Sequence, residues 1–334
     1  MAFSGKIRPL LASARVSNLP TVVSNVWLGV AVAGWIGTFH GLNPPILTAA
    51  AWLIPAGAAL YLGGNLLNDW KDREWDTRHR PERALPSGAF RPKSYLLAGI
   101  ALLAAGIGLA LAFHPLSAIA AAMIALSVVG YTSWHKRHPA SVALVALCRA
   151  LLPLLALAPL TATPAGFSTI PVLPSLAIFL HVAGLSARAR HESANHHRCS
   201  PTPAVAALVS AGPLMAVCAY LLMADHQAIM LTALAVWAVW TLRAIARFSA
   251  SPGKQVSALL AGIPLVDWVL LLPLGATMAL FAKVQPIITV RVPGSAMDVI
   301  PDFSAVGGPG IASMLLPPLA FLTSLALQRL SPAT

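Results

Sequence analysis

The sequence predicts an all-α, multi-pass membrane protein with nine or ten transmembrane helices, forming a single domain over residues 1–334. Charged residues make up only 10% of the chain, whereas an ordinary soluble domain has roughly 25%. Apolar residues reach 57%, and the mean hydropathy is +0.76. They gather in runs of about 20 residues, the length that a helix needs to cross a bilayer. This composition excludes a secreted disulfide scaffold, a soluble dinucleotide-binding enzyme and a disordered protein.

Ten apolar runs are candidate membrane-spanning helices. We expect the first to be retained rather than cleaved as a signal peptide, because Asn18, Ser24 and Asn25 interrupt its apolar stretch. In chain order, the runs cover residues 19–37, 46–68, 95–113, 116–133, 141–160, 170–187, 203–223, 228–248, 256–282 and 311–330.

The basic residues are distributed unevenly between the two sides of the predicted bundle. Eighteen of the 22 Lys and Arg residues lie in segments that would share one side, namely 6–15, 71–93, 136–137, 188–198 and 243–254. The opposite loops hold only Lys283 and Arg291. Basic loops remain on the cytoplasmic side, so we expect a cytoplasmic N-terminus, in the inner membrane if the cell is bacterial. The net charge of +12 therefore reflects membrane orientation, and we expect no nucleic-acid partner.

The connections between the runs leave no room for a large soluble domain. The longest inner loop covers residues 69–94, and the outer segment 284–310, rich in Pro and Gly, is expected to be irregular. Cys148, Cys199 and Cys218 are odd in number and form no CxxC pair. We therefore expect neither a disulfide framework nor a thiolate metal site.

Acidic side chains are concentrated directly after the second apolar run. Five of the ten acidic residues lie within positions 69–82, and Asn68, Asp72 and Asp76 are spaced by four. If the second helix continues past the membrane boundary, each step of four turns about 400°, so the three side chains share one face. Two carboxylates and an amide, completed by water and phosphate oxygens, suit Mg²⁺.

Basic side chains follow immediately. Arg80 and Arg83 are accompanied by Arg78, Arg91 and Lys93. Guanidinium groups bind phosphate oxygens in pairs, so the combined segment suits a diphosphate held through a metal. The alternative is a solvated loop in which acids and bases simply pair with each other.

The order of these residues resembles the first aspartate-rich motif of UbiA-type prenyltransferases. The resemblance is carried by Asn68-Asp69-x-x-Asp72-x-x-x-Asp76 and by Arg80-Pro81-Glu82-Arg83-Ala84-Leu85-Pro86-Ser87-Gly88. Segments 15–20 and 131–137 agree as well. The resemblance spans most of residues 15–268, and the last sixty-odd residues add little to it.

The resemblance implies about nine transmembrane helices around a central cavity that is open to lipid. It implies a prenyltransferase that moves an isoprenyl group from a prenyl diphosphate to an aromatic or other lipid-precursor acceptor, with Mg²⁺ as cofactor. By position, Asn68, Asp72 and Asp76 would hold the metal. The catalytic candidates are then Asp72, Asp76 and Lys136, and the substrate-binding candidates are Arg80, Arg83, Arg137 and Tyr131.

The second inner loop, residues 184–202, departs from the family pattern. Where that pattern has a second aspartate motif, residues 184–197 contain no aspartate, but Arg188, Arg190 and Glu192. We expect the arginines to bind diphosphate in place of a second metal, with Glu192 as a catalytic candidate that orients them. Otherwise, the reaction has been lost. The neighbouring histidines, at 191, 196 and 197, are interpreted as interfacial polar residues rather than metal ligands.

Two charged residues fall inside predicted spans, Arg149 in the fifth and Asp267 in the ninth. Unpaired charges at this depth are costly. They either pair with each other, lie near helix ends or line the cavity. We favour lining of the cavity, with Arg149 supporting the acceptor or the diphosphate.

Two other functions fit parts of the sequence. A catalytically degraded member of the fold, binding or carrying an isoprenoid or lipid, would explain the missing second motif. A small-molecule transporter would explain the charges within the membrane, but the polar motifs lie on one side only, which argues against alternating access.

Overall fold

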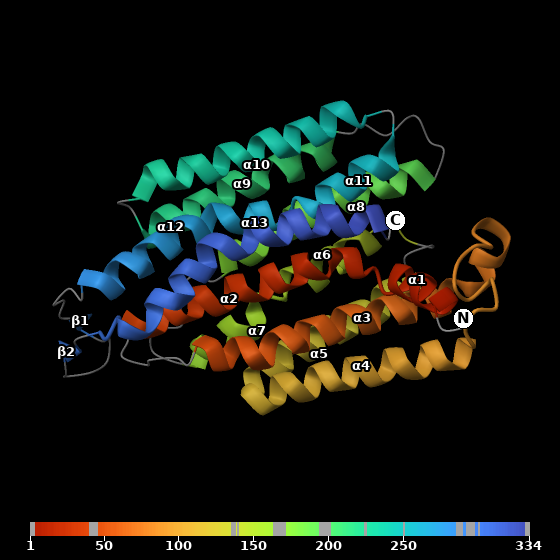
Figure 1. Cartoon of the computed structure of the whole chain (residues 1–334), viewed down its shortest axis with the longest axis horizontal. Coiled ribbons are helices and arrows are strands. Elements are labelled where there is room, and N and C mark those ends of the chain that lie inside the picture. The colour runs from red at the N-terminus through yellow and green to blue at the C-terminus, as the bar shows by residue number, and fades with distance from the viewer. Residues whose placement is uncertain are drawn as a thin grey trace.

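The helices form one elongated bundle, with most axes running close to its long direction (Figure 1). The computed structural model describes residues 4–39, 46–134, 138, 140–162, 172–193, 202–223, 226–249, 251–284, 290–291, 298–299 and 301–330. Within these ranges, nine helices are long and apolar enough to cross a membrane, or ten spans exist if one bent pair of helices is included. The prediction of an all-α membrane protein is therefore confirmed.

Each predicted span coincides with one helix or with two helices joined end to end. The helical elements are α1 (Ser4–Ser13), η1 (Val16–Asn18), α2 (Leu19–Phe39), α3 (Ile46–His79), α4 (Pro92–Phe113), α5 (Pro115–Trp134), α6 (Ser141–Ala150), α7 (Leu154–Leu157), η2 (Ala158–Ala162), α8 (Val172–Ser193), α9 (Thr202–Leu222), α10 (Gln227–Arg247), α11 (Pro252–Ala261), α12 (Ile263–Val284), η4 (Ser304–Val306) and α13 (Gly307–Leu330).

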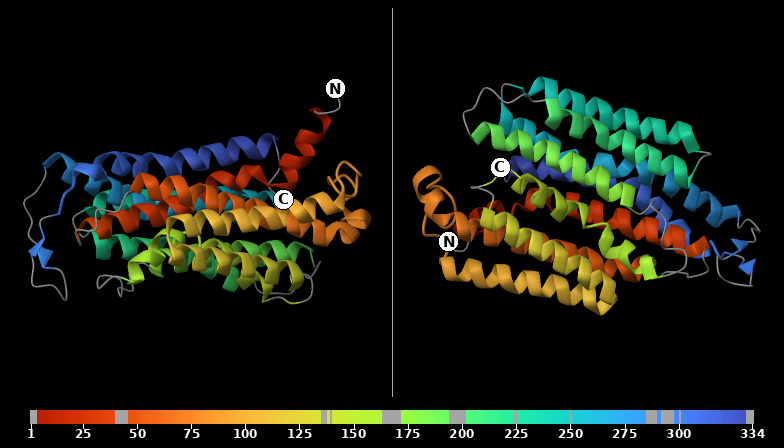
Figure 2. Two further views of the ribbon diagram at one scale, coloured as in Figure 1. Left: turned by 90° about the horizontal axis from the view of Figure 1, so that it is seen from below. Right: turned by 180° about the vertical axis from the view of Figure 1, so that it is seen from behind.

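The fifth span is broken. Its two parts, Ser141–Ala150 and Leu154–Leu160, meet at an angle of 54°. Helix α1 and the C-terminal end of α13 lie at the same end of the bundle in all views (Figures 1 and 2). Nine crossings would place them at opposite ends, so within the described residues the bent pair makes the tenth crossing.

Helix α3 is longer than predicted, because it continues through His79 instead of ending at the membrane boundary. Residues 69–79, expected to belong to an inner loop, are helical, and they contain neither Gly nor Pro before Arg80-Pro81 ends the helix. Its 34 residues extend about 50 Å, against roughly 30 Å of hydrocarbon core. The polar end of α3 therefore projects beyond the apolar layer.

Two further segments differ from the predicted loops. Helix α8 continues to Ser193, so the first half of the expected loop 184–202 is helical. In the outer segment 284–310, strands β1 (Val290–Arg291) and β2 (Asp298–Val299) form an antiparallel pair, where an irregular segment was expected.

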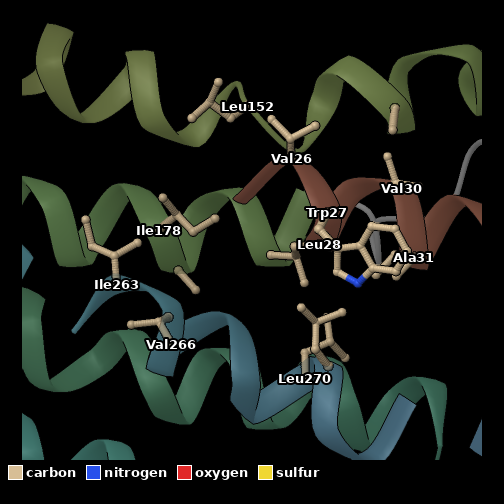
Figure 3. Close-up of a cluster of buried hydrophobic side chains, with 14 of the residues drawn as sticks. Val26, Trp27, Leu28, Val30, Ala31, Leu152, Ile178, Ile263, Val266 and Leu270 are labelled. Carbon is tan, nitrogen blue, oxygen red and sulfur yellow. The ribbon is translucent and has the colours of Figure 1, made fainter. Parts of the chain in front are cut away.

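The most buried helices, α2 and the α11–α12 pair, form the centre of the bundle. Figure 3 shows Leu28 of α2 close to Leu270 of α12, in a cluster that also includes Ile178 of α8 and Leu152. All four are at most 3% exposed. In the most apolar stretches of the outer helices α4 and α10, only 22% of the residues are buried, as expected of helices that face lipid.

Glycines allow α3 and α4 to pack closely. A Cβ atom on Gly63 would lie 2.9 Å from the carbonyl oxygen of Gly99, and one on Gly106 would lie 3.0 Å from that of Ala56. Small residues at such positions are typical of packed membrane helices. This contact fixes the position of the helix that carries the acidic residues.

The last helix, α13, lies against α2 and α12. The indole nitrogen of Trp27 donates to Ser313 Oγ at 3.0 Å, and that of Trp268 donates to the carbonyl of Met314 at 2.9 Å. A Cβ on Gly310 would lie 2.8 Å from the carbonyl oxygen of Gly275. Helix α13 thus covers the side of the bundle between α2 and α12.

Candidate functional site

The sequence motifs meet at one end of the bundle, here called the motif end. Figure 1 shows α1, the C-terminal turns of α3 and α8 and the N-terminal turns of α6 and α11 at this end, whereas β1 and β2 lie at the other. The polar and charged motif residues, although distant in sequence, therefore lie near the same end of the bundle.

Asn68, Asp72 and Asp76 lie on one buried face of α3, as their spacing predicts. They are 7%, 7% and 2% exposed, whereas Lys71 and Glu74 on the opposite face are exposed. Asn68 Nδ2 donates to Asp72 Oδ2 at 3.4 Å. The three side chains thus form a continuous polar strip along the inner side of the helix end.

This strip fits a hard cation. Asn68 Oδ1 and Asp76 Oδ1 are buried, and neither accepts a hydrogen bond from the described residues. Buried oxygens without a donor are uncommon in folded proteins, and an amide and carboxylates are ligands that Mg²⁺ accepts alongside water and phosphate. In the described part of the chain, no three His, Cys, Asp or Glu residues converge, so a cation here would need oxygens from substrate or water.

Arg83 reaches back over the strip from the α3–α4 loop. Its Nη1 lies 2.9 Å from Asp76 Oδ2 and 3.7 Å from Asp69 Oδ1. The loop is anchored because Leu85 packs in a small apolar cluster with Leu66 and Tyr95. Arg83 therefore has a fixed place beside the carboxylates. Arg80 is half-buried, and its side chain forms no ion pair with the described residues.

Arg15 is a site residue that our sequence reasoning did not assign. Its φ of 48° is the only left-handed non-glycine conformation among the described residues, and such outliers often mark functional positions. Its carbonyl accepts from Tyr61 Oη at 3.1 Å, and its Nη1 donates to Asn65 Oδ1 at 3.1 Å. Its Nη2 lies 4.0 Å from Asp69 Oδ1. The agreement of segment 15–20 with the family motif was the signal that could have identified it.

The charge of Arg15 is stabilised by these neighbours. Burial lowers the pKa of its guanidinium, but the negative charge of Asp69, together with other nearby groups, raises it above its usual value. Arg15 is therefore a cation at the edge of the strip, near the same Asp69 oxygen that Arg83 approaches.

A cavity of about 110 Å³, with mainly apolar walls that carry a few polar side chains, continues inward from the strip between α3, α5 and α6. Its wall includes Asn68, Tyr131 and Arg149, and the full lining is Arg15, Leu60, Tyr61, Gly64, Asn65, Asn68, Ile124, Val128, Tyr131, Thr132, Val145, Cys148, Arg149 and Leu152. A larger groove of about 520 Å³ lies on the outside between α2 and α13. No charged residue lines that groove, so the smaller cavity is the candidate site.

The two charges inside the membrane do not pair directly. Arg149 lines the cavity, as predicted, whereas Asp267 is fully buried and does not. Asn25 lies between them: its Nδ2 donates to Asp267 Oδ2 at 2.9 Å, and its Oδ1 accepts from Arg149 Nη1 at 3.4 Å.

The arginines of the second motif region contact different helices. The Nε of Arg188 donates to Gln255 Oε1 on α11, and Nη1 of Arg190 donates to Ser141 Oγ on α6 at 2.9 Å. Residues two apart on a helix point about 200° apart, so the pair does not act as one fork. Lys136 and Arg137 lie outside the described residues, as does the side chain of Glu192.

Comparison with known proteins identifies relatives over part of the chain. The sequence profile of the UbiA prenyltransferase family matches residues 22–261. A digeranylgeranylglyceryl phosphate synthase from Ignicoccus hospitalis is 34% identical over 137 residues, which are 41% of this chain and 42% of that protein. One from Halobacterium salinarum is 32% identical over 136 residues, covering 40% and 45%. The matched segments thus span less than half of each relative.

The fold also has a solved counterpart. A structure of a digeranylgeranylglyceryl phosphate synthase superposes with a TM-score of 0.53 at 20% identity, covering 81% of this chain and 97% of that one. At this identity, the likeness concerns the fold alone.

Proposed function

Because the chain belongs to the UbiA prenyltransferase family, we propose that it transfers an isoprenyl group within the membrane from a prenyl diphosphate to a lipid-precursor acceptor. The observation that carries the proposal is the buried strip of Asn68, Asp72 and Asp76. In this strip, Asn68 Oδ1 and Asp76 Oδ1 accept no hydrogen bond from the described residues. Arg15 and Arg83 flank this strip. A site with oxygen ligands and adjacent guanidinium groups suits a diphosphate better than any other common ligand.

The residues of the strip and its neighbours would act on the leaving group. Asn68, Asp72 and Asp76 would hold Mg²⁺, which would supply positive charge to neutralise part of the diphosphate. Arg83 and Arg15 donate hydrogen bonds to the diphosphate as it departs with the electron pair of the C1–O bond. The allylic cation left at C1 then accepts an electron pair from the acceptor, which forms the new bond and gives up a proton.

The apolar surroundings would protect this cation. Leu60, Ile124 and Val128 line the cavity behind the strip, and apolar walls keep water from capturing a reactive intermediate. A cavity of about 110 Å³ is too small for an isoprenyl tail, which would lie against apolar side chains outside it, since they gain by covering it.

The names of the relatives point to the first acceptor to test. Both relatives are digeranylgeranylglyceryl phosphate synthases, so a prenylated glyceryl phosphate is one candidate class. Aromatic acceptors form the second class. We place the motif end on the cytoplasmic side, because the basic segments gather there.

The missing second aspartate motif favours one alternative, a protein that binds prenyl diphosphate without turning it over. Purified protein in lipid nanodiscs is incubated with radiolabelled prenyl diphosphates of several chain lengths, Mg²⁺ and acceptors of both classes. Formation of a prenylated lipid together with diphosphate release supports the transferase. Saturable binding with no product in any combination would instead identify a carrier. Asp76→Asn serves as the inactive control in both measurements.

A further inference from the structure

We propose that Arg149 forms a second anion-binding subsite inside the membrane, which holds a compact anionic group, phosphate or carboxylate, of the acceptor. Asp267 and Asn25 would act as positioning residues for it. This inference rests on the proposed function and adds to it the chemical class of the acceptor.

The side chain of Arg149 is buried in surroundings that favour binding of an anion. The residue is 7% exposed and lines the cavity, and its guanidinium lies 5.0 Å from the ring centre of Tyr61. Among the described residues, its hydrogen-bond partner is Asn25 Oδ1 at 3.4 Å, and no carboxylate lies within 4.0 Å. A guanidinium has five N–H donors. Burying most of them without an anion is costly in a membrane protein.

Asp267 supplies the opposite charge but cannot fill the subsite. It is 0% exposed, and it accepts from Ser24 Oγ at 2.6 Å and from Asn25 Nδ2 at 2.9 Å. Because both Asn25 amide protons belong to its nitrogen, this contact turns Asn25 Oδ1 toward Arg149. The carboxylate thus orients the guanidinium from behind α2, while the cavity side of Arg149 stays available to a ligand.

The location of the subsite suits an acceptor rather than the prenyl diphosphate. Tyr61, Asn65 and Asn68 follow one another along the cavity face of α3, and the seven residues from Tyr61 to Asn68 rise about 10 Å. Arg149 lies at the Tyr61 level, deeper than the diphosphate strip. A hydrocarbon tail there would leave the cation without a counter-ion. A cavity of about 110 Å³ holds roughly the volume of three or four waters, which is enough for a small head group.

Matched pairs of acceptors test the inference without any mutation. Purified protein with a prenyl diphosphate and Mg²⁺ is given 4-hydroxybenzoate or 4-hydroxybenzamide, and geranylgeranylglyceryl phosphate or geranylgeranylglycerol. We expect kcat/KM to favour the anionic member of at least one pair by about 10- to 100-fold, as charged hydrogen bonds do. Which pair shows the preference tells carboxylate from phosphate. Equal use of both members in both pairs would overturn the inference.

Variants then assign the preference to Arg149. Arg149→Gln should reduce the preference to near unity by raising KM for the anionic acceptor, with KM for prenyl diphosphate within about twofold. Arg149→Lys should recover part of it, and Asp267→Asn should raise KM for the anionic acceptor more than KM for the neutral one. Arg243→Gln, which removes an exposed charge on α10, is the control. A rise in KM for prenyl diphosphate in Arg149→Gln would show that Arg149 serves the diphosphate instead.

The subsite can also be tested if the protein proves not to be a transferase. If the parent protein forms no product, calorimetric titration with the same acceptor pairs, in the presence of an unreactive prenyl thiolodiphosphate, still measures the preference. Tighter binding of the anionic member, lost in Arg149→Gln, would support the subsite in a carrier. Equal binding of both members would reject the subsite whether or not the protein is an enzyme.

Discussion

At the scale of single residues, the candidate site depends on side-chain oxygens that are buried but accept no hydrogen bond from the described residues. Asp76 shows this most clearly: one oxygen accepts from Arg83 at 2.9 Å, and the other has no donor among the described residues. Leaving a buried acceptor unsatisfied costs about 1–3 kcal/mol. The fold tolerates this cost at the position where a bound cation would remove it.

The first prediction concerns this carboxylate. Asp76→Asn should weaken Mg²⁺-dependent binding of a prenyl diphosphate by at least about 100-fold, because the site loses a charged ligand. Asp72→Ala should do the same. The control is Glu74→Gln on the exposed face of the same helix, where a side chain that is 84% exposed pairs with Arg73. Calorimetric titration measures all three, and parent-like affinity in Asp76→Asn would disprove the assignment.

The second prediction separates the two arginines near the end of α8. Arg190 contacts Ser141 on α6, the helix that also carries Arg149, whereas Arg188 is held by buried Gln255 on α11. We expect Arg190→Lys to weaken diphosphate binding by about tenfold, because lysine cannot form the bidentate fork. Arg188→Lys should have the smaller effect.

Metal content provides the complementary measurement for the same hypothesis. If arginine replaces a second metal, the diphosphate-bound protein should contain one Mg²⁺ per chain. Two bound Mg²⁺ ions would reject the hypothesis and indicate a second metal site with oxygen ligands not yet assigned. Lysine variants that bind like the parent would reject the role of the two arginines.

At the scale of elements, α3 determines the site because its close contact with α4 holds it in place. The third prediction tests this contact. Gly63→Ala should lower the apparent Tm by several degrees, since its new methyl group would meet the backbone of Gly99 and Leu103, and overpacking costs about 1–3 kcal/mol. Gly108→Ala on α4 meets nothing within 4 Å and should leave the Tm unchanged or raise it slightly. Thermal unfolding in detergent measures both, and equal Tm values would contradict the proposed packing.

Hydropathy predicts where the spans lie but not how they end or bend. The polar residues after Asn68 suggested a loop, although their four-residue spacing already allowed a buried helical face. Pro153 accounts locally for the break after Ala150, but its close packing against α2, where a Cβ on Gly29 would lie 2.7 Å from the Cα of Pro153, is a distant contact. The αL conformation of Arg15 likewise depends on Tyr61 and Asn65, and no local pattern specifies such partners.

At the scale of the whole molecule, the concentration of basic connections at one end of the bundle predicts its orientation in the membrane. The fourth prediction is that the motif end faces the cytoplasm. In a background without Cys148, Cys199 and Cys218, a cysteine at exposed position 79 should react with an impermeant maleimide only after the membrane is opened. A cysteine at exposed position 283, at the other end of the bundle, should react in intact cells. Labelling of position 79 from outside would reverse the assignment.

The uninterrupted length of α3 has a consequence for how two reactants meet. Tyr61 and Asp76 lie on the same continuous helix, and their fifteen-residue separation corresponds to about 22 Å. Because this helix is rigid, it would fix the depth of one reactant's binding site relative to that of the other, independently of the thickness of the surrounding bilayer. Thickening or thinning of the bilayer would move the helix as a whole without changing its length. The spacing between the two binding sites would therefore be set by the protein alone.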